Sequence, residues 1–345
     1  MRVPADVIQF SIDHIEVLSL ASARRAGRQR PHFKALGVLA MSRLNRLVRK
    51  CLAKISSSRQ KFESLAWRAH RVVEPMDVDA KRRSEIAKRL KDKVIDVGTC
   101  AMEDICQQGW FNKATQEILP GFAIHEDDTV VDVGCGEGGM SSYAALFGAD
   151  VIATDIDPTK IELLNRKLPV QGQTARSFKT IVSDSDPLPI ADGTASKVIS
   201  MEVLEHVDDP AKFMAELVRI GKVGALYLIS VPDPVGEALQ RVAAHPCYWE
   251  RPNHLRVFEH KDLDQLIENA GLKIEIRTRT GFFWTMWWML FWGAKQEFGA
   301  PQDPILEHWT KAWYGMVLSP TGAAARRALD DFMPKSQVVI ARKVA

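Results

Sequence analysis

Features of secreted and membrane-spanning proteins are scarce in this sequence. Its 345 residues contain only five cysteines, an odd number without C-x-x-C spacing, which argues against a disulfide framework and a cysteine-based zinc cluster. The first 35 residues lack an apolar run ending in a small-residue cleavage site. We therefore expect a cytoplasmic protein with reduced thiols, which could still lie on the inner face of a membrane. Whether translation starts at Met1 or at Met41 stays open.

Acidic residues are scarce near the amino terminus. Residues 1–93 contain 22 lysines and arginines against 9 acidic residues, whereas the remainder contains 24 against 34. Between Leu44 and Ile55, apolar residues recur at helical spacing with basic residues between them, which predicts a basic amphipathic helix. We expect residues 1–95 to form a basic, mainly helical arm. Such an arm would contact anionic phospholipid or nucleic acid, or would pack on the rest of the chain.

From Thr129 onward, short apolar strands alternate with helices. This alternation predicts an α/β domain over residues 96–345, with a parallel sheet covered by helices on both faces. An insertion of different composition separates the last apolar run from the strands before it. The expected strands are 129–133, 150–154, 180–183, 197–201, 225–231, 272–277 and 336–343, and the expected helices are 138–146, 158–168, 210–220 and 261–270.

A glycine-rich loop, Asp132-Val-Gly-Cys-Gly-Glu-Gly-Gly139, lies between the first expected strand and the helix after it. Its glycines permit a tight turn and close contact between the backbone and a ligand. The loop differs from dinucleotide-binding loops because its third glycine comes early and Asp132 precedes the first glycine by two positions. An acid at this position would repel a pyrophosphate, but it could receive the ammonium group of an amino-acid moiety.

Two further acids lie at the ends of the next two strands. Asp155 follows the glycine loop by about 20 residues, at a position where a carboxylate can bind both hydroxyls of a ribose. Asp184 ends the third strand, where its carboxylate can accept from an adenine amino group while the next backbone N–H donates to the ring. The fourth strand leads into Ser200-Met-Glu-Val-Leu-Glu-His-Val-Asp-Asp-Pro210.

In their order and spacing, these stretches resemble the class I S-adenosylmethionine-dependent methyltransferases over about residues 110–273. The resemblance implies a Rossmann-like sheet of seven strands, a final antiparallel strand with a helical insertion at 278–335 before it, and S-adenosylmethionine as cofactor. The cofactor-binding residues that it implies are Asp132, Gly134 and Gly136 for the methionine part, Cys135 in the same loop, Asp155 for the ribose, Asp184 and Ser185 for the adenine, and Ile156 and Met201 flanking the adenine ring.

The E-V-L-E-H stretch contains the candidate catalytic residues Glu202 and His206. With Glu205 they have the spacing that places side chains on one face of a helical turn, and His254 follows downstream. The ubiquinone-biosynthesis O-methyltransferases and the small-RNA 2′-O-methyltransferases look similar here and hold a metal with such residues. The resemblance implies either a divalent cation, Mg²⁺ or Mn²⁺, at Glu202, Glu205, His206 and His254, or a metal-free site in which His206 is a general base or substrate contact.

The insertion has an unusual composition. It contains six of the nine tryptophans of the chain, and its run Gly281–Ala294 carries no charge. These 14 residues are too few for a bilayer span, which needs about 20, but tryptophan favours the membrane interface. Three interpretations stay open: a lid over the substrate, an interfacial membrane anchor, and the contact face of a homodimer.

The sequence thus predicts an enzyme that methylates a hydroxyl group of an amphipathic or membrane-associated acceptor, such as a lipid-linked sugar, a glycan or a quinone-type ring. The alternatives are N- or C-methylation of a small metabolite, methylation of a nucleic acid, and cofactor binding without catalysis. A D-P-P-Y or N-P-P-Y motif, typical of amino-methylation of nucleic acids, is missing after the fourth strand, where Met201-Glu-Val-Leu stands instead. We therefore do not expect a nucleic acid as the acceptor.

Overall fold

The computed structural model describes residues 95–171, 174–319 and 321–344. The chain divides into two compact units, Met1–Trp67 and Arg68–Ala345, and all of the described residues belong to the second unit. The predicted basic arm and its amphipathic helix therefore lie outside the described residues.

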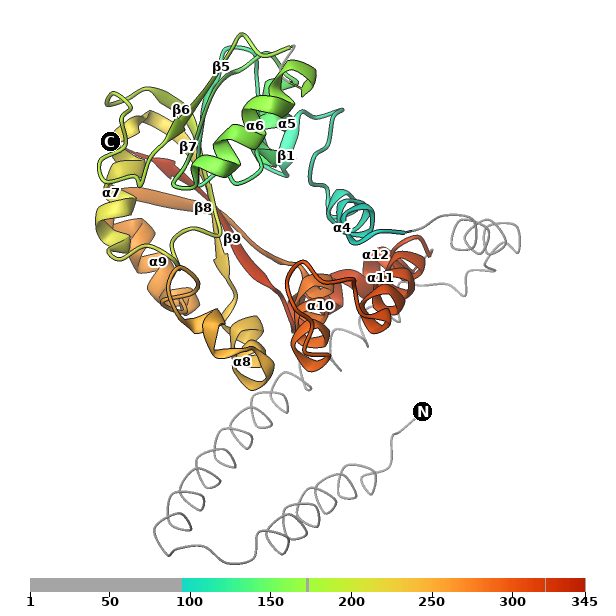
Figure 1. Ribbon diagram of the computed structural model, residues 1–345. Coiled ribbons are helices and arrows are strands. Elements are labelled where there is room, and N and C mark those ends of the chain that lie inside the picture. Colours follow the sequence, from blue (N-terminus) through green and yellow to red (C-terminus); the bar gives the residue numbers. More distant parts are fainter. Residues whose placement is uncertain (1–94, 172–173, 320, 345) are drawn as a thin grey trace, which may run out of the picture. The chain divides into compact units, whose positions relative to one another are not determined.

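A seven-stranded sheet forms the centre of the second unit (Figure 1). Its strand order is β5-β4-β3-β6-β7-β9-β8, and the last strand in sequence, β9, is antiparallel to both of its neighbours. The other neighbouring pairs are parallel, which confirms the predicted fold class. The strands are β3 (Thr129–Val133), β4 (Asp150–Asp155), β5 (Ser177–Val182), β6 (Ala195–Met201), β7 (Gly221–Pro232), β8 (Leu272–Thr280) and β9 (Ser336–Lys343).

Helices cover both faces of this sheet (Figure 1). Buried side chains of β3, β6 and β7 pack toward α7 and α9 on one face and toward α5 on the other, so the sheet lies between two apolar layers. A short hairpin, which the sequence patterns did not reveal, adds to the layer that contains α5. The covering elements are α5 (Gly139–Ala145), α6 (Pro158–Gln171), α7 (Pro210–Ile220), α9 (His260–Asn269) and the hairpin β1 (Glu117–Leu119) and β2 (Phe122–Ala123).

Besides α6, which begins directly after Asp157, three helices start at Asp-Pro pairs. Asp209, Asp233 and Asp303 each accept a hydrogen bond from a backbone N–H of the first helical turn. Proline suits the first position of a helix, because a backbone N–H there would have no partner within the helix. These pairs fix where α7, α8 (Pro234–Ala243) and α11 (Pro304–Val317) begin. The sequence prediction identified only the first of these starts.

The predicted helical insertion before the last strand is present. It begins later than expected because β8 continues to Thr280, so residue 278 still pairs with β9. Its helices pack with one another and with the helix that precedes the sheet, around a separate apolar cluster that includes Phe283 and Trp313. None of the helices in the described part of the chain combines the length and apolar character needed to cross a membrane. The group consists of α4 (Val97–Cys106), α10 (Phe282–Gly293), α11 and α12 (Gly322–Phe332).

Candidate functional site

A cavity of about 470 Å³ lies at the carboxyl ends of β3, β4, β5 and β6. The chain reverses its direction of strand addition between β3 and β6, and such a switch point is where open α/β sheets bind their ligands. The side chain of Ile156 is 70% exposed, which leaves an apolar surface that a flat ring could cover. Six of the predicted site residues line this cavity: Gly134, Asp155, Ile156, Asp184, Ser185 and His206.

The glycine loop packs closely against its surroundings at one position and is open at another. Gly134 has a φ of +75°, and a Cβ atom there would lie 2.4 Å from the side chain of Val203. Gly136 has a φ of +54°, but a Cβ atom there would meet nothing within 4 Å. Gly134 therefore allows the loop to pack on the segment after β6, and Gly136 leaves open space beside its backbone, as close approach of a ligand requires.

Asp155 joins the glycine loop to the tip of β4. One carboxylate oxygen accepts from the backbone N–H of Gly136 at 2.8 Å, and the other accepts from that of Asp157 at 2.9 Å. Each carboxylate oxygen can accept two hydrogen bonds, so Asp155 keeps one free acceptor position on each oxygen. A ribose with two adjacent hydroxyls matches this pair of positions.

Asp132 lies beneath the cavity and does not line it. The backbone N–H and the hydroxyl of Ser141 both donate to the same oxygen of Asp132, at 3.1 and 2.5 Å, so this acid holds the first turn of α5. Burial raises the pKa of Asp132 to about 6. Contact with the ammonium group of a cofactor stays a prediction. Cys135 does not line the cavity either, and burial raises the pKa of its thiol to about 12.

We expected Met201 to lie beside Ile156, but it does not. Side chains alternate along a strand, and Met201 lies on the same face of β6 as Ile199, which packs toward α5. Met201 therefore lines a second, smaller cavity on the other side of the strand end.

Glu202 does not join the other candidate metal ligands. Its φ of +55° ends β6, and residues 204–206 form a turn instead of the expected helical turn, so the spacing of the three residues does not put them on one face. One carboxylate oxygen of Glu202 accepts from the hydroxyl of Ser230 at 2.8 Å, and the other accepts from Nζ of Lys335 at 3.2 Å. Glu202 therefore lies outside the group that the structure brings together, and its role as a metal ligand stays a prediction.

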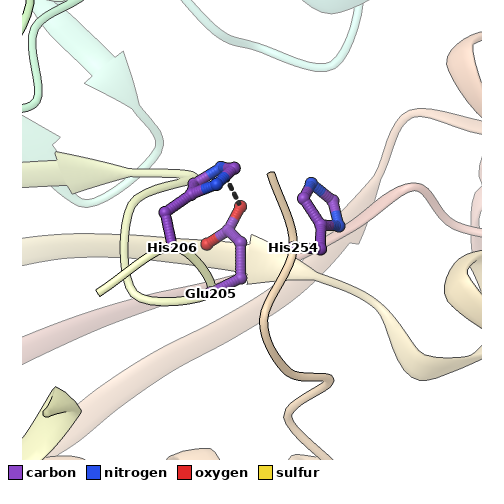
Figure 2. A group of neighbouring side chains, drawn as sticks. All are labelled: Glu205, His206 and His254. Atoms are coloured by element: carbon purple, nitrogen blue, oxygen red, sulfur yellow. Dashed lines mark ion pairs between the residues drawn. The ribbon is translucent and has the colours of Figure 1, made fainter. Parts of the chain in front are cut away.

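The remaining three residues do lie together (Figure 2). One ligand atom each from Glu205, His206 and His254 lies within 4.8 Å of the others, and Nε2 of His206 lies 3.6 Å from the nearer oxygen of Glu205. Both carboxylate oxygens of Glu205 are buried and have no hydrogen-bond partner in the described part of the chain. An unpaired buried carboxylate is costly, so this group is incomplete without a proton or a cation.

Hydrogen bonds fix which nitrogen of each histidine is free. Nδ1 of His206 lies 3.0 Å from the carbonyl oxygen of Pro252, and Nδ1 of His254 lies 3.0 Å from a carboxylate oxygen of Glu237. Both partners are acceptors, so each Nδ1 carries the hydrogen and each Nε2 keeps its lone pair. Metal-binding histidines are commonly oriented in this way.

Charges around the group favour a bound cation. Burial, and then the charge of Glu202, raise the pKa of Glu205 well above its ordinary value. Burial and then His254 lower the pKa of His206, so its ring is neutral near pH 7. Lys335 keeps a raised pKa despite burial, because Glu202, Glu237 and Glu205 surround it. This single cation faces three carboxyl groups.

The sequence analysis missed Lys335, Glu237 and Tyr248. Tyr248 donates to Glu237 at 2.8 Å, and Glu237 in turn accepts from His254, so the two orient a candidate ligand. All three residues lie far in sequence from the E-V-L-E-H stretch and belong to no motif. Only the folded chain brings them to the site.

The donor set fits a divalent metal. It offers one carboxylate and two imidazole nitrogens with free lone pairs, a combination that suits Mn²⁺ or Fe²⁺ and also accepts Zn²⁺ or Mg²⁺. Nε2 of His206 is its one free nitrogen, so the ring cannot both bind a metal and accept a proton from a substrate. The two roles predicted for His206 therefore exclude each other.

Comparisons with known proteins agree with the site. Residues 131–229 match a protein family described as a methyltransferase domain. The tocopherol O-methyltransferase of Arabidopsis thaliana is 41% identical over 102 residues, which are 29% of this chain and 29% of that protein. A probable S-adenosylmethionine-dependent methyltransferase of Mycolicibacterium smegmatis is 29% identical over 148 residues, or 42% of this chain and 52% of that protein.

A solved structure, geranyl diphosphate C-methyltransferase from Streptomyces coelicolor A3(2), is 15% identical, with a TM-score of 0.45, and the alignment covers 77% of this chain and all of that chain. The alignments with the two curated relatives span at most about half of the length of those proteins. From the family match and these relatives, the chain carries an S-adenosylmethionine-dependent methyltransferase domain of class I.

Proposed function

We propose that this protein transfers the methyl group of S-adenosylmethionine to a hydroxyl oxygen of an amphipathic acceptor. The observation that carries the proposal is the position of His206, which lines the cofactor cavity and also belongs to the group with Glu205 and His254. A side chain that could accept a hydroxyl proton thus lines the cavity that would hold the methyl donor. The ribose and adenine would contact Asp155, Asp184 and Ser185 in the same cavity.

In the proposed reaction, the acceptor oxygen attacks the methyl carbon of the sulfonium, and the carbon–sulfur bond breaks with its electron pair returning to sulfur. The hydroxyl proton must leave. In a metal-free site, Nε2 of His206 accepts this proton, because its neutral ring has no other free nitrogen. A divalent cation held by Glu205, His206 and His254 would instead lower the pKa of the hydroxyl. Alignment within the cavity supplies the rest of the acceleration.

A labelling experiment tests the transfer. The purified protein is incubated with methyl-labelled S-adenosylmethionine and a whole-cell lipid and glycan extract, and the labelled product is identified by NMR. We expect a methoxy signal that is missing with the Asp155→Asn variant. A label on nitrogen or carbon would replace this proposal with N- or C-methylation. If no product is labelled, the remaining interpretation is a protein that binds the cofactor without catalysis.

The surface of α10 supports an acceptor that comes from a membrane. Phe282, Phe283 and Phe291 are buried, but the other large side chains of this helix are only half-buried, and the neighbouring Phe298 is 70% exposed. Phe298 packs against Trp288, Phe291 and Trp292 with ring centres 5.0 to 6.1 Å apart. This aromatic cluster matches the amphipathic character of a membrane interface.

Vesicle sedimentation tests the membrane contact. We expect the protein to sediment with phosphatidylglycerol vesicles at low salt, and Phe298→Ser to reduce the bound fraction. Val223→Ser is the matched control, because Val223 is also 70% exposed but lies at the opposite end of β7 from the cofactor cavity. Equal binding of both variants would contradict a contact through α10, and concentration-dependent dimers disrupted by Phe298→Ser would assign the cluster to a homodimer.

A further inference from the structure

A second cavity of about 130 Å³ adjoins the cofactor cavity at the end of β6. Met201 and Glu202 line the smaller cavity, and the next residue, Val203, lines the larger one. The smaller cavity lies between α4, α5 and α10, so the helical insertion closes it from one side. A cofactor bound in the larger cavity would therefore have the smaller cavity beside it as a place for the acceptor group.

The walls of this cavity are mainly apolar and adaptable. Trp110 and Trp284 supply aromatic surface, and Met140 and Met201 supply flexible thioether side chains. The charged side chains in its wall are Asp104, which accepts from the indole N–H of Trp313 at 3.0 Å, and the pair Glu202 and Lys335, which lie 3.2 Å apart. The opposite charges of Glu202 and Lys335 therefore balance each other within the wall.

We propose that this cavity receives a single, mainly apolar six-membered ring that carries a hydroxyl group, that is, a phenol-like acceptor. This inference rests on the proposed methyl transfer. A cavity of about 150 Å³ is known to take one benzene molecule, so about 130 Å³ matches the size of one ring and is small for two fused rings. The polar side chains of Asp104, Ser230 and Thr280 in the wall already form hydrogen bonds with Trp313, Glu202 and Gln108, so a sugar ring would find few further partners for its hydroxyls. The cavity therefore favours a ring acceptor over a lipid-linked sugar or a glycan.

The charged pair would orient the ring. A ring hydroxyl other than the one that is methylated can donate to the carboxylate of Glu202 and accept from the ammonium group of Lys335, while the methylated hydroxyl would face the larger cavity, which His206 lines. Ser230 holds the second carboxylate oxygen at 2.8 Å, so the carboxylate has a fixed position. A ring without a hydroxyl would form no hydrogen bond with Glu202 or Lys335 and would bind less tightly.

The binding of small ring probes tests this inference. It is measured by ligand-observed NMR on protein saturated with S-adenosylhomocysteine. We expect 4-methylphenol to bind at least tenfold more tightly than toluene, and methyl glucoside and 2-naphthol not to bind. Glu202→Gln should reduce the preference for 4-methylphenol over toluene. Trp284→Ala should enlarge the cavity and admit 2-naphthol, whereas Trp288→Ala, on the same helix but outside the cavity, should behave as the wild type. Met140→Ala is the second enlarging variant if Trp284→Ala does not fold.

Three results would overturn the inference. The first is equal behaviour of Trp284→Ala and Trp288→Ala, and the second is binding of the glucoside as tight as that of 4-methylphenol. The third is a matching loss of S-adenosylhomocysteine and probe binding in both enlarging variants, which would place part of the cofactor in this cavity. Failure of the wild type to bind S-adenosylhomocysteine by calorimetry would overturn the proposed function itself. Normal cofactor binding without probe binding would overturn only the ring acceptor.

Discussion

Replacement of Asp155 by asparagine separates the cofactor assignment from the stability of the fold. The carboxylate of Asp155 accepts from two backbone N–H groups on opposite sides, Gly136 at 2.8 Å and Asp157 at 2.9 Å. Asparagine keeps the shape but offers one oxygen and one amide nitrogen, so one of these N–H groups loses its acceptor. The side chain is only 5% exposed, which leaves little water to replace the lost bond.

The expected magnitudes follow from these bonds. An unpaired buried donor costs about 1–3 kcal/mol, so the free energy of unfolding should fall by that amount. A hydrogen bond to a charged group contributes about 1.5–3 kcal/mol, and the asparagine loses the charge that the ribose hydroxyls would meet. The dissociation constant for S-adenosylhomocysteine should therefore rise roughly 10- to 150-fold.

Calorimetric titration with S-adenosylhomocysteine measures the affinity, and urea unfolding measures the stability of the same samples. Asp157→Asn is the matched control: it removes the same charge two residues away, Asp157 does not line the cavity, and its oxygen can still accept from Thr159. We expect nearly unchanged affinity for this variant. A folded Asp155→Asn protein with wild-type affinity would refute the assignment of the ribose to Asp155.

Three further predictions concern the cation, a buried bond and pH. His254→Asn removes one of the two free Nε2 lone pairs, so Mn²⁺ binding, followed by electron paramagnetic resonance, should weaken roughly tenfold or more while the affinity for S-adenosylhomocysteine changes little; equal Mn²⁺ binding would place the cation elsewhere. Trp313→Phe removes the indole N–H that donates to buried Asp104 at 3.0 Å, and should lower the free energy of unfolding in urea by about 1–3 kcal/mol; no change would contradict this. Burial raises the pKa of Asp104 to about 6 and that of Asp330 to about 7, so these groups hold more protons in the folded than in the unfolded protein. The free energy of unfolding should therefore fall as pH rises from about 4 to 7. Asp104→Asn should make this fall less steep, and a steeper fall in the variant would contradict the prediction.

Residues close in sequence allowed most of the sheet to be predicted. Strand β3, helix α7 and strand β9 begin and end where expected, because each combines a continuous apolar pattern with a clear boundary residue. Strand β5 was placed three residues late. Its exposed positions alternate with half-buried ones, so its apolar signal is weak near Ser177.

The candidate site was less predictable than the fold. Asp155, Asp184 and His206 could be found because each follows a strand whose carboxyl end faces the cavity. Glu202 could not be placed correctly, because its positive φ depends on the packing around the end of β6 and not on spacing. Lys335 lies 133 positions after Glu202, and their contact arises only because β9 inserts between β7 and β8, which brings residue 335 near the end of β6.

The segment between α8 and α9 connects three parts of the site. Arg251 and Pro252 line the cofactor cavity, and His254 belongs to the group with Glu205 and His206. Tyr248 contacts Trp292 of α10, with ring centres 6.0 Å apart, and also donates to the glutamate that orients His254. A cation bound to His254 would therefore fix the position of this segment. The same segment lines the cofactor cavity through Arg251 and Pro252 and contacts α10 through Tyr248. Because coupling between binding sites is reciprocal, a cofactor that is held more tightly when the cation is bound must tighten the cation by the same factor. A bound cation and a bound cofactor would therefore be coupled through this segment.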